Sequence, residues 1–324
     1  HLASSAASDV YKRQGLMIRS GTQVTAEVIA AASKLKIIGR AGVGVDNVDV
    51  PAATQRGVLV VNSPEGNTIA AAEHALAMML SLSRHVPQAH AGMRAGKWDR
   101  KKYVGNELYK KTLGVVGLGK IGSHVARVAR AMGMEVIAYD PFIAADRAQQ
   151  MQVRLTELDE LFRTADYVTL HIPRTKDTEN LVNAELLRTM KPTARIVNCA
   201  RGGVVDEAAI AEAINNGVIA GAGLDVYASE PLAEDSPLRA VERGLVLTPH
   251  LGASTEEAQE NVAIDVAEQI RDVLLGLPAR SAVNIPGLSA EIMERLKPHL
   301  QLAETVGGLV SQLSGGQVQE LELG

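Results

Sequence analysis

The hydrophobic pattern of the chain changes near Thr112. From there on, short runs rich in β-branched residues alternate with amphipathic segments, which is typical of β-α-β units in a parallel sheet. We predict six strands in this part, at Leu113–Gly117, Glu135–Tyr139, Tyr167–His171, Arg195–Cys199, Ala220–Val226 and Leu245–Leu247. Helices are expected between them, around Ile121–Met132, Glu157–Thr164 and Glu207–Asn216. Gly217 follows the last of these, where a helix stop signal belongs.

The part before Thr112 follows a different pattern. The stretch LKIIGRAGVGVDNVD predicts a strand followed by a glycine-rich turn, and a second strand is expected at Val58–Asn62. An alanine-rich helix should run from Thr68 to about His85, with Pro87 ending or kinking it. Residues 93–104 form a basic loop that contains Trp98, which is either an interface residue or a packed loop residue.

The two ends of the chain stand apart from this pattern. Residues 1–14 are rich in serine and alanine without apolar periodicity, so we interpret them as a foreign or disordered tail. A helix at Thr255–Leu275 returns the chain toward its first part, and residues 284–286 close a linker. Residues 289–324 begin a further α-rich piece.

Length and charge narrow the functional classes. A chain of 324 residues usually forms more than one hydrophobic core, so we expect two domains. The net charge of −4 and the lack of a long basic block argue against nucleic acid or an anionic membrane as the partner. The single cysteine, Cys199, excludes an internal disulfide framework, and we expect a cytoplasmic protein.

A glycine motif follows the first predicted strand of the α/β part. Gly117, Gly119 and Gly122 give G-x-G-x-x-G, in which the glycines permit a tight turn, close approach of a pyrophosphate and helix-on-strand packing. The next strand ends in Asp140, where a carboxylate can accept hydrogen bonds from ribose hydroxyls and repel a 2′-phosphate. The motif therefore predicts NAD rather than NADP, although Asp140 could also be a turn residue before Pro141.

Three ionisable residues follow the last three predicted strands. Arg201, Glu230 and His250 should lie at the carboxyl edge of the sheet, where ligands bind in such folds. In the strand order 3-2-1-4-5-6, these are the fourth, fifth and sixth strands, away from the adenine-binding half. A histidine can accept the proton of an alcohol near neutral pH, a carboxylate can orient its ring, and a guanidinium can bind a substrate carboxylate.

The other histidines have simpler interpretations. Packing or exposure on helices explains His74, His85, His90 and His124, whereas His171 ends a strand and either lines the cofactor cleft or is structural. No cysteine-histidine metal cluster, nucleophile elbow or P-loop is recognisable in the sequence, so we expect no metal.

Four motifs make the chain similar to a known family. GRAGVGVDNVD (39–49), NCARGGVVDE (198–207), LDVYASEP (224–231) and TPHLGAST (248–255) resemble the D-isomer-specific 2-hydroxyacid dehydrogenases. The resemblance implies an α/β fold, with a Rossmann-type doubly wound parallel sheet plus a smaller flavodoxin-like substrate domain. The implied domains are 15–86 (an incomplete first part) and 253–288 for substrate, 87–252 for NAD, and 289–324 as the start of a truncated regulatory region. It also implies that family members carry a further segment before Gly15, including the first strand of the substrate domain.

The resemblance implies roles for particular residues. His250 would be the proton donor and acceptor of an Arg201/Glu230/His250 triad. Substrate would meet Arg40, Val43, Gly44 and Arg201, with Arg100 and Lys101 as weaker candidates. NAD contacts are implied at Ser63, Gly117, Gly119, Lys120, Ile121, Gly122, Asp140, His171, Ile172, Cys199, Ala200, Arg201, Asp225, His250, Gly252 and Ala253, with Asp225 meeting the nicotinamide amide.

The function implied is NAD-dependent oxidation of a small 2-hydroxy acid. The favoured substrate is 3-phosphoglycerate, oxidised to 3-phosphohydroxypyruvate in serine biosynthesis, and the chain would act as a homodimer or homotetramer. The alternatives are a dehydrogenase for glyoxylate, hydroxypyruvate or lactate, and a dinucleotide-sensing protein of the corepressor type.

Overall fold

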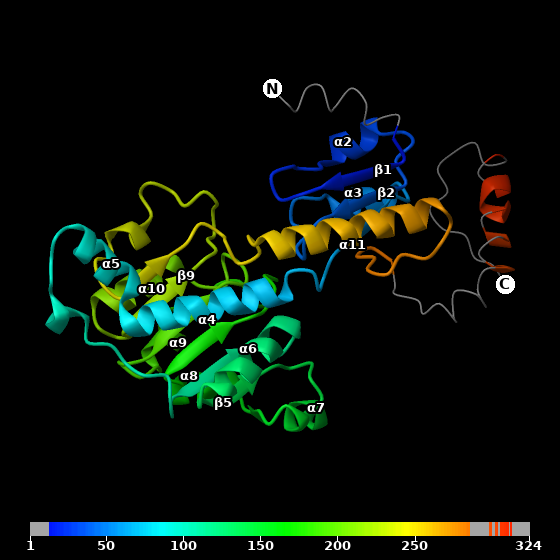
Figure 1. Cartoon of the computed structure of the whole chain (residues 1–324). Coiled ribbons are helices and arrows are strands. Elements are labelled where there is room, and N and C mark those ends of the chain that lie inside the picture. The colour runs from blue at the N-terminus through cyan, green and yellow to red at the C-terminus, as the bar shows by residue number, and fades with distance from the viewer. Residues whose placement is uncertain (1–12, 286–297, 300–301, 304, 311, 313–324) are drawn as a thin grey trace. The chain divides into compact units, whose positions relative to one another are not determined.

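The computed structural model describes residues 13–285 together with 298–299, 302–303, 305–310 and 312. It divides the chain into two compact units (Figure 1). One comprises residues up to Pro64 and from Ala263 onward, and the other comprises Glu65–Val262. Most of the predicted N-terminal tail and much of 289–324 lie outside the described residues, and the predicted domain boundaries stay predictions.

The larger unit is built on a parallel seven-stranded sheet in the order β10-β9-β8-β7-β4-β5-β6. Its strands are β4 (Thr112–Val116), β5 (Glu135–Tyr139), β6 (Arg154–Leu155), β7 (Tyr167–Leu170), β8 (Arg195–Asn198), β9 (Gly221–Leu224) and β10 (Leu245–Leu247). The six predicted strands are all present, with small differences at their ends. Most are rich in buried apolar residues, as expected for a sheet covered on both faces.

The predicted strand order is wrong at one place. The strand at Tyr167 pairs directly with β4, whereas the edge beyond β5 is formed by β6. The two residues of β6 are too few to give a periodic signal, so the sequence does not predict this strand. Arg201, Glu230 and His250 therefore follow the fifth, sixth and seventh strands of the sheet in chain order.

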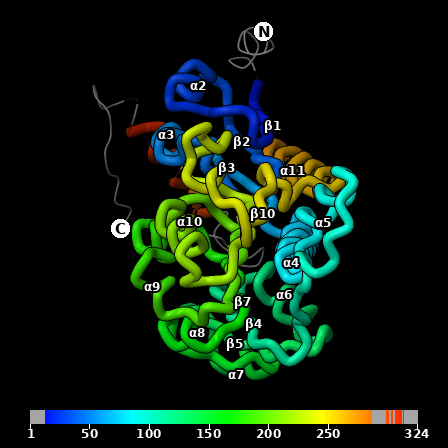
Figure 2. The backbone as a smooth tube through the Cα atoms, turned by 90° about the vertical axis from the view of Figure 1, so that its left-hand side faces the viewer, coloured from blue at the N-terminus to red at the C-terminus, as the bar shows by residue number. Residues whose placement is uncertain are grey.

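Helices cover both faces of this sheet (Figure 2). On one face lie α4 (Thr68–Arg84), α6 (Lys120–Ala131) and α7 (Ala145–Gln150). On the other lie α8 (Leu158–Thr164), α9 (Ala184–Arg188) and α10 (Glu207–Asn215). Two apolar clusters, one on each face, form the core of the unit. This is the doubly wound arrangement that the sequence predicts.

Local signals fix where several of these helices end. Asp206 caps α10 by accepting hydrogen bonds from the N–H groups of Ala208 and Ala209. Gly217 follows α10 with a φ of 70°, as expected for a glycine stop. The alanine-rich helix α4 ends at His85, which takes a left-handed conformation, and Pro87 lies in the first turn of α5 (Val86–Arg94). The predicted break at this proline is therefore confirmed. Short 3-10 turns follow at η1 (Arg100–Tyr103) and η2 (Pro237–Ala240).

The smaller unit is a parallel three-stranded sheet in the order β1-β2-β3. Its strands are β1 (Gly15–Ile18), β2 (Ile37–Arg40) and β3 (Leu59–Asn62), of which only β1 was not predicted. Residues of α2 (Ala26–Ala31) and α3 (Val50–Gln55) share one apolar cluster with the sheet. The part of α11 (Glu256–Leu274) from Ala263 onward packs against Gly39 through Val266 and Ile270. None of the helices in the described part of the chain is both long enough and apolar enough to cross a membrane.

Candidate active site

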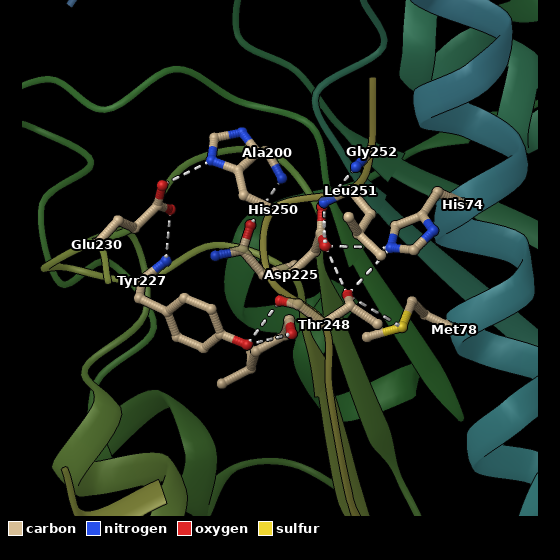
Figure 3. A network of polar contacts seen from close by, with 12 residues as sticks. His74, Met78, Ala200, Asp225, Tyr227, Glu230, Thr248, His250, Leu251 and Gly252 are labelled. Carbon is tan, nitrogen blue, oxygen red and sulfur yellow. Dashed lines mark hydrogen bonds and ion pairs between the residues drawn. The ribbon is translucent and has the colours of Figure 1, made fainter. Parts of the chain in front are cut away.

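His250 and Glu230 form a hydrogen-bonded pair in the loops that follow β10 and β9 (Figure 3). The Nδ1 atom of His250 lies 2.7 Å from Oε2 of Glu230. The other oxygen of Glu230 accepts the backbone N–H of Tyr227 at 3.1 Å, which fixes the carboxylate in its own turn. Because Nδ1 faces a carboxylate, its proton is held there, and the lone pair of the neutral ring is on Nε2. About half of the His250 side chain is exposed, so Nε2 can meet a ligand.

Asp225 organises the turn that carries His250. The N–H of His250 donates to the backbone oxygen of Asp225, whose carboxylate accepts the N–H groups of Leu251 and Gly252 at 2.7 and 2.8 Å. The hydroxyl of Thr248 donates to the same carboxylate at 2.5 Å. Burial alone would raise the pKa of Asp225, but these hydrogen bonds outweigh it and lower the pKa. His250 itself has a left-handed φ of 55°, so this turn needs such support.

His74, which is expected to be a packing or exposed residue of α4, is mostly buried there and also has polar partners that the sequence does not predict. Its Nε2 atom lies 3.2 Å from the Asp225 carboxylate and 3.1 Å from the Thr248 hydroxyl. A signal was present in the sequence, because His74 falls on the same helix face as Met78, which is buried. A polar side chain among buried apolar neighbours needs a polar partner. Nothing in the sequence indicates which partner that would be.

The turn that carries Arg201 packs against the loop that follows β9. The Asn198 side chain accepts the N–H of Ala200 and donates to the carbonyl of Arg201, so this turn is fixed from within. A Cβ on Gly202 would lie 1.7 Å from the carbonyl oxygen of Tyr227, so only glycine allows this close approach. The turn after β8 thus lies against the segment that holds Glu230. Nη1 of Arg201 donates to the carbonyl of Ala200 at 2.7 Å.

The glycine-rich turn after β4 has the form that a dinucleotide site requires. Gly117 has a φ of 92°, and a Cβ on Gly122 would lie 1.9 Å from the Gly117 carbonyl oxygen. Gly119, in contrast, has no atom within 4 Å of where its Cβ would be. The next residue, Lys120, begins α6, whose first turn has no side-chain cap. Open space beside a helix N-terminus with uncapped N–H groups fits the pyrophosphate of a dinucleotide.

Asp140 contacts this turn directly. One oxygen of its carboxylate accepts the N–H of Leu118 at 2.7 Å, and the other accepts the N–H of Phe142 at 2.9 Å. The sequence predicts a ribose contact at Asp140 but does not indicate that its carboxylate also shapes the turn. A carboxylate has about four acceptor positions, so both tasks are compatible.

Other predicted cofactor residues surround the same turn. The His171 carbonyl oxygen and the Ile172 side chain lie 2.6 and 2.9 Å from where a Cβ on Gly117 would be. Burial lowers the pKa of His171 to about 4, so its ring is neutral near pH 7. Burial and Asp225 together raise the pKa of the Cys199 thiol, which keeps it protonated. Ile121 is half-buried, and the amine of Lys120 pairs with the carboxylate of Glu65. Ala200 and Ala253 are half-buried near the ends of β8 and β10.

In the smaller unit, predicted residues gather around the turn after β2. The Arg40 guanidinium folds over Gly42, and the Asn62 side chain donates to the Val43 carbonyl at 2.6 Å. Gly44 lies in the same turn. The Ser63 hydroxyl is buried and finds no hydrogen-bond partner among the described residues, which fits a residue that contacts a ligand.

The basic loop after α5 belongs to the larger unit. Arg100, Lys101 and Trp98 are all exposed there. Trp98 is therefore not a packed loop residue, and its predicted place in an interface stays a prediction.

A cavity of about 600 Å³ lies beside the His250–Glu230 pair. Apolar side chains form much of its wall, among them Tyr227, Leu232 and Leu247. Burial, with a contribution from Asp225, raises the pKa of Tyr227 to about 12. Its hydroxyl is therefore protonated and lies within hydrogen-bond distance of the carbonyls of Leu224 and Thr248, which ties the ends of β9 and β10 together.

Comparisons with known proteins agree with this geometry. Residues 76–252 match the family described as D-isomer specific 2-hydroxyacid dehydrogenase, NAD binding domain. A curated relative, D-3-phosphoglycerate dehydrogenase of Synechocystis sp., is 66% identical over 94% of this chain, which covers 55% of that relative. The chain spans between about half and three fifths of the length of the curated relatives it matches first.

Solved structures give the same result. The TT0316 protein of Thermus thermophilus superposes with a TM-score of 0.80 at 36% identity, covering 87% of this chain and 89% of that one. A D-lactate dehydrogenase of Aquifex aeolicus, solved with NAD and lactic acid, superposes with a TM-score of 0.78 at 28% identity, covering 87% and 90%. The chain therefore belongs to the D-isomer-specific 2-hydroxyacid dehydrogenase family and carries its NAD-binding domain.

Proposed function

We propose that this chain is the catalytic part of an enzyme that oxidises 3-phosphoglycerate to 3-phosphohydroxypyruvate with NAD, a step of serine biosynthesis. The observation that carries the proposal is the His250–Glu230 pair at the carboxyl edge of a dinucleotide-binding sheet. The substrate assignment rests on the 66% identity to a relative named D-3-phosphoglycerate dehydrogenase.

The proposed chemistry follows from the protonation of the pair. Bound NAD⁺ supplies the acceptor for the hydride that leaves C2 of the substrate. The Nε2 lone pair of His250 accepts the hydroxyl proton, because Nδ1 is held by Glu230 at 2.7 Å. The imidazolium that forms is then stabilised by the Glu230 carboxylate. In the reverse direction His250 returns the same proton to the carbonyl oxygen.

The substrate carboxylate needs cationic and N–H partners. Arg201 can bind it and polarise the developing carbonyl, and a guanidinium suits both tasks because it is planar and always charged. We further propose that Arg40 and the N–H groups of Val43 and Gly44 bind the anionic groups of the substrate.

The proposed NAD contacts remain those around the glycine-rich turn, with Asp140 at the ribose and Asp225 at the nicotinamide amide. Oδ2 of Asp225 accepts the N–H of Gly252 at 2.8 Å. A carboxylate oxygen can accept two hydrogen bonds, so Oδ2 keeps capacity for the amide.

A direct test combines turnover with cofactor binding. His250→Ala should lower kcat by several orders of magnitude while the Kd for NADH changes little, because the imidazole moves a proton rather than holding the dinucleotide. His90→Ala, an exposed histidine of α5, is the matched control and should leave both values unchanged. Loss of NADH binding together with turnover would contradict the acid-base role.

The substrate assignment is tested separately. Rates of NAD reduction with 3-phosphoglycerate, glycerate, glycolate and D-lactate should be highest for the phosphorylated acid. These rates should be measured on this chain and, for comparison, on the full-length Synechocystis sp. relative. A higher rate with an unphosphorylated acid would favour another dehydrogenase of the family. Peptide binding with negligible turnover on every acid would favour the corepressor type.

We also propose that the chain forms a homodimer or homotetramer. Several large apolar side chains between residues 86 and 104 are exposed, among them Trp98 at 74%, Val104 at 76% and Met93 at 53%. Such a set is typical of a self-association surface. Analytical ultracentrifugation should give a mass of two or four chains, and a monomer at micromolar concentration would contradict the proposal.

A further inference from the structure

Three successive backbone N–H groups point at one residue, Asp225. Those of His250, Leu251 and Gly252 donate to its backbone oxygen, Oδ1 and Oδ2 respectively. Asp225 therefore determines where the backbone of His250 lies. The Asp225 side chain is fully buried, so its own position depends on the polar groups that surround it.

One of these groups comes from a different element. Thr248, Leu251 and Gly252 belong to the loop after β10, whereas His74 belongs to α4. Asp225 lies between this loop and His74 and contacts both. Figure 3 shows the imidazole on the α4 side of the carboxylate, opposite His250. His74 thus links Asp225 to a helix of 17 residues that packs on the sheet.

The hydrogen positions in this cluster follow from the donors available. The Thr248 hydroxyl has one proton and two acceptors in reach, Asp225 at 2.5 Å and Met78 Sδ at 3.8 Å, so with either of them it can only accept from His74. An ionised carboxylate also only accepts. His74 must therefore carry a proton on Nε2, which lies 3.2 Å from Asp225 Oδ1 and 3.1 Å from Thr248 Oγ1. This arrangement satisfies all three groups at once.

A metal ion is a poorer explanation for the same cluster. Ligand atoms of His74, Cys199 and Asp225 lie within 4.8 Å of one another. However, N–H and O–H groups already point at both oxygens of Asp225, and their positive hydrogens would repel a cation. The donors that already face both oxygens of Asp225 therefore favour a hydrogen-bond network over a metal site at this cluster.

We propose that His74 is a positioning residue for the reaction: it holds Asp225 and thereby fixes the turn that aims His250. The expected effect on catalysis rests on the proposed function. The contact between His74 and Asp225 does not, because it forms in the protein without substrate or cofactor. It gives the alanine-rich helix a role beyond packing.

The test uses two substitutions at position 74 and one beside it. His74→Phe keeps the ring volume but removes the donor, whereas His74→Gln keeps an N–H donor that can reach the position of Nε2. Glu73→Gln changes the exposed neighbour on α4 and serves as the control. The measurements are kcat, the Kd for NADH, the melting temperature, and hydrogen exchange of the Leu251 and Gly252 amides without cofactor.

We expect His74→Phe to lower kcat about 10- to 100-fold, because a misplaced catalytic group costs rate even when binding persists. The Kd for NADH should change by less than roughly 5-fold, and the two amides should exchange faster. His74→Gln should restore kcat to within roughly 5-fold of the parent chain and restore slow exchange. Glu73→Gln should match the parent chain in all four measurements.

Two results would overturn the proposal. One is unchanged kcat and amide exchange in His74→Phe. The other is an equal loss of kcat in His74→Gln and His74→Phe together with the same drop in melting temperature. That result would mean that His74 contributes only packing. If the parent chain oxidises none of the acids, the proposed function fails instead, and amide exchange alone then decides whether His74 holds the turn.

Discussion

At the residue scale, the environment of each histidine decides what that histidine can do. His250 is half exposed with one nitrogen held by Glu230, which suits a group that exchanges a proton with a ligand. His74 is mostly buried and acts as a donor to Asp225. His171 lies beside the glycine-rich turn, where its Nε2 is 2.9 Å from the Thr169 hydroxyl. Of these three environments, the one at His250 combines a half-exposed ring with a nitrogen held by a carboxylate.

His171 should make the protein less stable in mild acid. Its pKa is about 4 in the folded protein, against an ordinary value of 6.5, because burial disfavours the charged ring. Between pH 4 and pH 6.5 the unfolded chain binds a proton at His171 more readily than the folded chain does. The contribution of His171 to the free energy of unfolding is therefore fully present above about pH 6.5 and falls as the pH drops toward 4. The loss from His171 should reach about 2 kcal/mol between about pH 7.5 and pH 5.

Urea unfolding at about pH 7.5 and pH 5 checks this expectation. In His171→Gln the loss of unfolding free energy between the two pH values should be smaller by about the same 2 kcal/mol. His90→Gln, at an exposed position, should behave as the parent chain does. An identical loss in the parent chain and in His171→Gln would show that His171 does not titrate abnormally.

Some residues of the candidate site could be predicted from local sequence pattern and others could not. Arg201, Glu230 and His250 could be predicted because each follows a strand, and strand ends can be located from local pattern alone. The partners of His74 could not, because Thr248 lies 174 positions further along the chain. Contacts of that kind depend on how α4 packs across the sheet, which no local pattern records.

At the element scale, two glycines of the glycine-rich turn have different reasons to be glycine: one is required by packing, and the other leaves space for a ligand. Gly122 lets α6 approach β4, since a Cβ there would meet the Gly117 carbonyl. Gly119 faces open space, so no contact within the described protein requires a glycine at this position. The two glycines of one motif should therefore respond differently to the same substitution.

Gly119→Ala should bind NADH at least about tenfold more weakly, because its Cβ would occupy the space proposed for the pyrophosphate. Its unfolding free energy should change by less than about 1 kcal/mol. Gly122→Ala should instead lose about 1–3 kcal/mol of stability through overpacking. Calorimetry for NADH binding and urea unfolding measure the two effects.

The control is Gly21→Ala, which also adds a methyl group in open space but lies in the smaller unit. It should change neither quantity appreciably. Normal NADH binding by Gly119→Ala would contradict the proposed position of the pyrophosphate.

Most elements, short strands included, could be predicted from local sequence pattern. Glu135–Tyr139 and Leu245–Leu247 were predicted with the bounds that the structure has, and the break between α4 and α5 followed from Pro87. β6, with two residues, carries too little pattern, and its omission shifted the numbering of the strands behind it. β1, although as long as β2 and β3, directly follows the segment that is interpreted as a tail, and its short apolar run alone does not identify a strand.

At the scale of the whole molecule, the smaller unit is assembled from two distant segments of the chain. Residues 13–64 supply its sheet, and residues 263–285 return to complete it. Asn284 is a polar link between them. Its side chain accepts the N–H of Val60 at 2.8 Å and donates to the Val58 carbonyl at 2.9 Å. It also donates to the Thr54 hydroxyl at 3.1 Å.

Asn284→Ala should therefore destabilise the smaller unit selectively, by about 1–3 kcal/mol, since it removes these bonds and leaves partly buried backbone groups unpaired. Hydrogen exchange of peptides from β2 and β3 should accelerate, whereas peptides from β4 and β5 should exchange as before. Asn284→Asp keeps the acceptor for Val60 but sets a carboxylate oxygen against the Val58 carbonyl, so it should destabilise the unit at least as much as Asn284→Ala does. Equal acceleration in both sheets would mean that the units unfold together, and the link at Asn284 would then stabilise the molecule as a single cooperative structure.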